Sequence, residues 1–346
     1  MRNKNLEVYR VALMFGICFL HCVSQGGHVR TWLANILLSC VDGFVFISGY
    51  FGIRFMPSKI LRLYGMAVMS GLLLLALGTY FNLMPPFGTE AYLKLVKNSL
   101  WGFWFLNAYV FMMCLTPLVD KVFEVVPRKQ WAPIFLPVLA LPFVWTFASE
   151  LPIIGCVLPK TSGLGSYSGT TLLGVYICAR ICRNLDIERY LSLKRIALLL
   201  PVFWFFTAIG FGDYASLFTV GLCALMFYLF KAAKIPRMVG SACTFLAPSM
   251  FCVYMLHTNF IGFPLIRRLE DMFVDGQGMN VYLTYPICAC IIFFGALLLD
   301  MPRRMLGRLF RAPLKRIYLY IDTLYMNLID ADSTIRGRKE HIDASC

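Results

Sequence analysis

The first apolar segment of the chain carries a cationic side chain at each end. Arg10 and His21 flank the run "VALMFGICFL". Eleven residues are almost three turns of an α-helix, so both side chains lie on one helix face, roughly 16 Å apart along the axis. A guanidinium can bind a phosphate, and an imidazole can take a proton from a hydroxyl. The two residues form a line rather than a cluster, so their partners must come from other segments.

Two further titratable residues fall at nearly the same depth as His21 in the predicted bundle. His21, Asp42 and His257 each lie roughly 18–20 Å from one end of the bundle, at about 1.5 Å per residue. Ionisable residues within a membrane are costly and usually face the bundle interior. Because a carboxylate beside an imidazole sets its tautomer and basicity, we expect His21 and Asp42 to form a catalytic pair. The open alternative is that Asp42 bonds a neighbouring Ser or Tyr and His21 bonds a backbone carbonyl.

Three other polar residues are candidates for substrate contacts or structural support. Asn107, in "WGFWFLNAY", falls close to the same depth. Tyr254 precedes His257 by three residues and shares its helix face. For His257 this spacing favours a structural hydrogen bond over catalysis.

A second basic group, "GIRFMPSKILRLYG", follows the second apolar segment. Arg54, Lys59 and Arg62 lie at the same membrane surface as Arg10, so the four cations could hold the phosphates of a nucleotide-containing donor. The alternative is that Arg10 is an anchor whose charge reaches the interface and that the other three lie in an ordinary positive loop.

The composition excludes a soluble globular protein. Of the 346 residues 59% are hydrophobic and 14% are charged, and apolar runs repeatedly approach the ~20 residues that cross a bilayer. The net charge of +14 lies in short loops, so it fits membrane orientation and not nucleic-acid binding. The 13 cysteines are scattered and form no ligand pattern, so neither a metal site nor a disulfide framework is expected.

The sequence therefore predicts an all-α, polytopic integral membrane protein with about ten transmembrane helices. The expected spans are 8–26, 32–54, 62–83, 100–119, 131–150, 167–182, 196–211, 214–230, 245–266 and 281–301. With the N-terminus inside, 26 of the 32 lysines and arginines fall in cytoplasmic segments, which places both termini in the cytoplasm. Residues 1–302 form one membrane domain. Residues 303–346 form a basic juxtamembrane tail, either lying on an anionic membrane surface or serving as a stop-transfer charge cluster.

Four stretches of the chain resemble membrane acyltransferase family 3, bacterial enzymes that O-acylate surface glycans and related molecules. Arg10 and His21 reproduce the arginine, ten residues, histidine signature of that family. The other stretches are "VDGFVFISGYFGIRF" with the following "SKILRLYG", "LWGFWFLNAYVF" and "FCVYMLHTNF". The resemblance covers roughly residues 5–300. This sequence departs from the family pattern at Lys59, where arginine is expected, and at Gly65, where proline is frequent.

The resemblance implies an acyl-CoA donor, commonly acetyl-CoA, presented from the cytoplasm of a bacterial cell. The acceptor would be a hydroxyl of a surface glycan or lipid-linked saccharide reached from the other face of the inner membrane. Arg10 would then mark the entrance of the donor and His21 the reacting end. Membrane lipids are the remaining expected partners, and no metal cofactor is implied.

A second function class stays open at this stage. In a transporter or glycan-lipid flippase, His21, Asp42 and His257 would relay protons or bind cargo. The sequence contains no evident inverted repeat and no matched pair of broken spans, which such transporters usually have.

Overall fold

The computed structural model describes residues 3–25, 31–80, 102–137, 139–140, 169–211, 216–258, 262–274 and 276–343, together with residues 90, 93, 96 and 97. Within these ranges the chain is helical and contains no strand, in agreement with the predicted all-α class. The main helices are α1 (Lys4–Gln25), α2 (Thr31–Phe51), α3 (Pro57–Tyr80), α5 (Trp104–Val125), α7 (Gly169–Asn184), α8 (Leu193–Phe206), α9 (Leu217–Ala232), α10 (Arg237–Leu246), α11 (Met250–His257), α12 (Gly262–Val274), α13 (Val281–Leu309) and α14 (Arg311–Asp343).

Five helical segments in the described part of the chain are long and apolar enough to cross a membrane. They are Lys4–Ser24, Trp32–Phe51, Pro57–Tyr80, Arg237–His257 and Tyr282–Leu309, and Leu217–Ala232 is a shorter apolar helix. The protein is therefore a multi-pass membrane protein by length and composition. Most of the expected span 131–150 lies outside the described residues.

The expected ninth span, 245–266, differs from the structure at both ends. The helical segment begins at Arg237 and is continuous through a short 3₁₀ turn, Ala247–Ser249, to His257. A new helix, α12, starts at Gly262, and a side chain there would lie 2.5 Å from the carbonyl oxygen of His257. The close approach of the two helix ends requires glycine, and hydropathy does not detect it.

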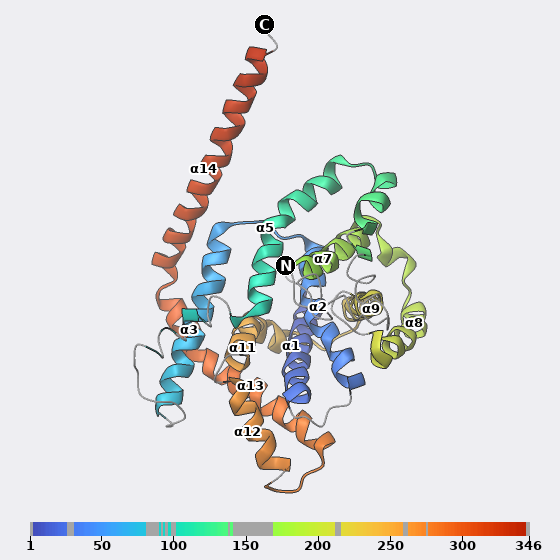
Figure 1. Ribbon diagram of the computed structural model, residues 1–346, viewed down its shortest axis with the longest axis vertical. Helices are drawn as coiled ribbons and strands as arrows, with labels where there is room; N and C mark the ends of the chain where they lie inside the picture. Colours follow the sequence, from blue (N-terminus) through green and yellow to red (C-terminus); the bar gives the residue numbers. More distant parts are fainter. Residues whose placement is uncertain are drawn as a thin grey trace, which may run out of the picture.

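Helices α1 and α2 form the centre of the molecule (Figure 1). On one side they pack against α7 and α9, and on the other α1 contacts α11 and α13. Gly49 of α2 allows the close contact with α7, because a Cβ at this position would lie 2.6 Å from the backbone oxygen of Tyr176. The Ser-Gly-aromatic pattern of the sequence is thus a helix-packing feature, and Gly52 with φ of 80° then ends α2.

Apolar packing on both sides of the central pair holds the bundle. One cluster joins α1 and α2 to α5, α7 and α9, with Phe46, Tyr176 and Phe227 fully buried. A second cluster joins α1 and α2 to α3, α11 and α13. Because α1 lies between the two clusters, most of its apolar side chains and the Glu7 carboxylate are buried within the protein.

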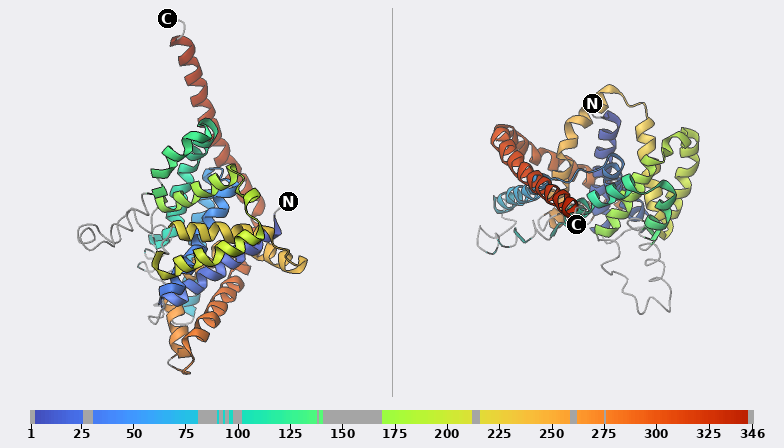
Figure 2. Two further views of the ribbon diagram at one scale, coloured as in Figure 1. Left: turned by 90° about the vertical axis from the view of Figure 1, so that its right-hand side faces the viewer. Right: turned by 90° about the horizontal axis from the view of Figure 1, so that it is seen from above.

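The C-terminal tail is a helix in the structure. Helix α14 begins beside α3 and extends away from the bundle as far as Asp343 (Figures 1 and 2). Its first half is fixed to α3 by Asp322, which accepts hydrogen bonds from the Ser58 backbone N–H (3.1 Å) and hydroxyl (2.6 Å). Pro57, at the first position of α3, has no N–H to satisfy there, and Ser58 supplies the donor that Asp322 binds.

Candidate active site

One face of α1 lines a cavity of about 220 Å³. Arg10, Met14, Ile17 and His21 contribute to its wall. Their spacing is the i, i+4, i+7, i+11 pattern of one helix face, so local helix geometry alone places them together. The predicted alignment of Arg10 with His21 is realised as two polar groups on one cavity.

The other cavity walls come from segments distant in sequence. Helix α2 contributes Val41, Phe44 and Ser48, a second stripe at helical spacing. The remaining residues come from α3, α5 and the segment around α11: Leu63, Trp104, Phe105, Tyr109, Ala247, Met250, Phe251 and Tyr254. Apart from Arg10, His21, Ser48 and the two tyrosines, the lining is apolar or aromatic, which suits an extended, largely apolar chain.

The two membrane histidines contact each other. His21 Nδ1 lies 2.9 Å from His257 Nε2, and the ring centroids are 5.0 Å apart. On its other side, His257 Nδ1 lies 2.6 Å from the carbonyl oxygen of Val253, one turn earlier in α11. Phe263 of α12 packs edge-on against His21, with ring centroids 5.4 Å apart.

This chain of contacts assigns the protons of both neutral rings. A carbonyl oxygen only accepts hydrogen bonds, so His257 carries its proton on Nδ1 and donates it to Val253. His257 Nε2 is then an acceptor, and the Nδ1–H of His21 donates to it. The remaining nitrogen of His21, Nε2, therefore has its lone pair available as a base. His257, and not Asp42, contacts the ring nitrogen of His21 at which an orienting partner was expected.

Asp42 lies in a different part of the bundle. It is fully buried on the side of α2 that packs against α7 and α9, near Cys178 of α7 and Cys223 of α9. The cavity is lined by the preceding residue, Val41, and not by Asp42. The structure thus brings His21 together with His257, and it does not bring Asp42 to His21.

Arg10 is held at the cavity by a carboxylate that the sequence analysis did not single out. Arg10 Nη1 lies 2.6 Å from Glu7 Oε1, and the Glu7 side chain is only 2% exposed. The i, i+3 spacing on one helix could have revealed this ion pair. Because a guanidinium has five N–H donors, Arg10 can keep this bond and still donate to a ligand in the cavity.

Of the remaining polar side chains near the site, some line the cavity and one lies outside it. Ser48 and Tyr109 line the cavity with their hydroxyl oxygens 3.2 Å apart. Tyr254 lines the cavity next to the histidine pair, with its ring centroid 6.2 Å from that of His257. Asn107 lies outside the lining, where its side-chain oxygen accepts a 2.7 Å hydrogen bond from Tyr64 and joins α5 to α3.

The basic residues at the start of α3 do not gather at Arg10. The Lys59 ammonium donates to the backbone oxygen of Arg54. Arg62 points toward α14, with its guanidinium carbon 4.9 Å from the centre of the Tyr318 ring. Of the four cations predicted to share a donor site, only Arg10 lines the cavity that contains His21.

The described part of the chain offers no clustered set of metal ligands. No group of three or more His, Cys, Asp or Glu side chains there is placed to hold a metal ion. The 11 cysteines described are free thiols, five of them buried. The polar groups of the cavity are therefore those of acid–base and anion-binding chemistry.

Comparison with known proteins identifies the family. The family model described as "Acyltransferase domain" (acyltransferase family 3) matches residues 3–317, almost the whole described bundle. No curated protein and no solved structure matches the chain. The match includes α1 with Arg10 and His21, the segment that carries His257, and the first turns of α14, and the chain belongs to acyltransferase family 3.

Proposed function

We propose that this membrane acyltransferase moves an acyl group, most simply acetyl, from cytoplasmic acyl-CoA to a hydroxyl of a surface or lipid-linked glycan. The observation that carries the proposal is the single cavity lined by both Arg10 and His21, with the free nitrogen of His21 assigned by the contacts of His257. Family membership supports acyl transfer. The cavity lining supports the binding of an acyl-CoA donor at Arg10 and the use of His21 as the base.

The reaction needs a base because a hydroxyl is a weak nucleophile at neutral pH. His21 Nε2 takes the proton of the acceptor hydroxyl while the oxygen of that hydroxyl attacks the thioester carbonyl carbon. The carbon–sulfur bond then breaks, and the CoA sulfur leaves and receives the proton from His21. The products are an O-acyl ester and free CoA. His257 orients the imidazole and accepts a stronger hydrogen bond from Nδ1 while His21 is protonated.

The donor would enter at the Arg10 end of the cavity. Along α1, Arg10 and His21 are roughly 16 Å apart, and the wall between them is formed by Met14 and Ile17. An extended pantetheine arm fits a narrow apolar passage of this kind, with a phosphate at the guanidinium and the thioester near the imidazole. Arg54 and Lys59 are further candidates for phosphate contacts outside the cavity.

The distribution of lysines and arginines supports an orientation with both termini in the cytoplasm. The donor end would then face the cytoplasm, and the histidine pair would lie in the outer half of the bilayer. We propose the bacterial inner membrane as the location, because acyl-CoA is made in the cytoplasm and surface glycans are modified outside it.

The deciding experiment measures acyl-CoA consumption by the purified full chain in nanodiscs with a candidate glycan acceptor. Free CoA and acylated acceptor, detected by mass spectrometry, are expected to rise together for wild type and not for His21→Ala. Transfer that persists in His21→Ala would contradict the assigned base. Movement of an unmodified glycan lipid across the bilayer without thioester loss would instead favour a flippase.

A further inference from the structure

A second and larger hollow lies on the other side of α3 from the active-site cavity. This groove of about 970 Å³ runs between α3, the end of α13 and the start of α14. On α3 it is lined by Arg62, Gly65, Met66 and Met69, an i, i+3, i+4, i+7 stripe, whereas Leu63 of the same helix lines the cavity. Helix α3 therefore separates two binding volumes, and the proposed acyl transfer uses only one of them.

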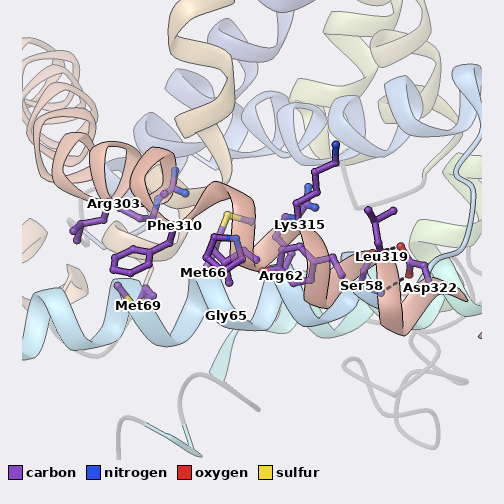
Figure 3. A pocket seen from close by; sticks show the side chains of 15 residues that line it. Ser58, Arg62, Gly65, Met66, Met69, Arg303, Phe310, Lys315, Leu319 and Asp322 are labelled. Carbon is purple, nitrogen blue, oxygen red and sulfur yellow. Dashed lines mark hydrogen bonds between the residues drawn. The ribbon is translucent and has the colours of Figure 1, made fainter. Parts of the chain in front are cut away.

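The groove combines cations with an apolar surface. Three cations, Arg62, Arg303 and Lys315, line it together with one carboxylate, Asp322. Figure 3 shows Arg62 and Lys315 near the middle of the groove, and Met66, Met69 and Phe310 on the side toward Arg303. Met69 and Phe310 are 46% and 57% exposed, so this apolar stretch is open to a ligand or to lipid.

The groove lining carries a net positive charge. Arg303 is paired with Asp300, and Asp322 accepts hydrogen bonds from the neutral Ser58, which leaves one carboxylate charge against Arg62 and Lys315. In the described part of the chain, Arg62 and Lys315 have no hydrogen-bond or ion-pair partner, and Arg62 only stacks on the Tyr318 ring. Arg62 on α3 and Lys315 on α14 are thus two cations of a partly apolar groove that are available to a ligand.

Two glycines keep the groove open. Gly65 of α3 and Gly307 of α13 both line it, and a Cβ added at either position would meet no atom within 4 Å. Neither has a positive φ. Glycine inside a helix costs about 0.5–1 kcal/mol relative to alanine, and no contact at these positions requires it. With hydrogen in place of a side chain at both positions, the groove is wider there than a larger residue would leave it.

We propose that this groove binds one anionic phospholipid of the adjoining leaflet, with its phosphate at Arg62 and Lys315 and an acyl chain along Met66, Met69 and Phe310. Basic pockets between membrane helices are suited to anionic headgroups, and the methionine-rich wall adapts to a flexible chain. The bound lipid bridges α3 and α14, and so fixes the start of the C-terminal helix to the bundle. A CoA nucleotide fits less well, because the apolar stretch offers a chain-shaped surface beyond the cations.

The test is lipid retention by the full chain, which does not depend on acyl transfer. The protein is reconstituted in nanodiscs of phosphatidylethanolamine with or without phosphatidylglycerol, extracted, and examined by native mass spectrometry. Wild type is expected to retain one phosphatidylglycerol in preference to phosphatidylethanolamine. The double variant Arg62→Ala/Lys315→Ala should bind it roughly 30-fold more weakly, about fivefold per cation. Arg316→Ala removes an exposed neighbouring cation outside the groove lining and is the matched control.

A second variant tests the apolar part without changing charge. Gly65→Leu fills the groove and should abolish the retained lipid, whereas Gly295→Leu, at a glycine of α13 outside the lining whose Cβ also meets open space, should not. Equal retention by wild type, the double variant and Gly65→Leu would overturn the proposal. Displacement of the lipid by 3′-phospho-ADP would also overturn it and assign the groove to the nucleotide of the donor.

Discussion

The two faces of α3 border hollows that differ in how their polar groups are held. In the cavity, Arg10 is paired with Glu7, and His21 is fixed through His257 to the backbone of Val253. In the groove, Arg62 and Lys315 have no such hydrogen bonds among the described residues. A preorganised set of dipoles is what catalysis requires, whereas adaptable cations are sufficient to hold a lipid headgroup.

The cavity and the groove also differ in how much protein borders them. Five helices and the 3₁₀ turn Ala247–Ser249 border the cavity, and His257 is buried, so the contact between His21 and His257 counts for more than it would in water. Three helices border the groove, and several of its apolar residues are exposed. We therefore expect single substitutions in the cavity to change rates strongly, and substitutions in the groove to change lipid binding instead.

The largest expected effect is that of His21→Ala. Loss of a positioned general base lowers the rate of acyl transfer by ~10²–10⁴-fold, because the acceptor hydroxyl must then lose its proton to water. The measurement is mass spectrometry of cell-surface glycan from cells that make equal amounts of each variant. Cys22→Ala, the neighbouring buried residue that does not line the cavity, is the control and should retain transfer. Near wild-type acylation by His21→Ala would contradict the assignment of His21 as the base. The cavity would then no longer differ from the groove as the place of catalysis.

Arg10→Ala should act on the donor rather than on the chemical step. A charge-assisted hydrogen bond to a phosphate contributes about 1.5–3 kcal/mol, so the KM for acyl-CoA should rise ~10–150-fold with little change in kcat. Arg10→Lys should raise the KM for acyl-CoA less than Arg10→Ala does, because lysine keeps the positive charge but lacks the forked N–H donors of the guanidinium. Lys4→Ala, an exposed cation of the same helix, is the control. An unchanged KM would make Arg10 an interfacial anchor of α1.

His257→Ala should lower kcat by ~10–100-fold, the usual cost of losing a group that orients a reacting side chain. Without it, the Nδ1–H of His21 has no acceptor and the ring can rotate or adopt the other tautomer. His257→Gln restores an acceptor oxygen and should recover part of the rate, which a merely structural role would not predict. A KM effect without a kcat effect would show that His257 shapes the cavity instead of orienting the base.

Local periodicity explains which parts of the site the sequence could predict. Arg10 and His21 belong to one helix, so 3.6 residues per turn determined their shared face. The partner of His21 depends on how α2 and α11 are rotated about their axes, and equal depth in the membrane does not contain that information. Asp42 lies about 100° around α2 from Val41, which is enough to turn it from the cavity toward α7 and α9.

The groove could not be predicted for a related reason. Its walls come from residues near positions 65, 307 and 315, and the sequence does not say that these segments adjoin. Gly65 was noticed only as a departure from the family pattern. The predicted count of about ten spans is not confirmed: among the described residues, five helical segments are long and apolar enough to cross a membrane, and Leu217–Ala232 is a shorter apolar helix.

The smallest expected effect on the reaction is that of Asp42→Asn. The two side chains have the same shape, and Asn keeps an oxygen acceptor on the buried side of α2 that faces α7 and α9. Because Asp42 does not orient His21, kcat should stay within about twofold of wild type and the pH dependence of the rate should not move. The thermal unfolding midpoint in nanodiscs is expected to change instead, because the carboxyl and amide groups differ in their hydrogen-bonding atoms at a fully buried position of the α2 packing surface. A shifted pH profile with an unchanged unfolding midpoint would restore the His21–Asp42 pair and contradict the assignment of His257 as the orienting residue.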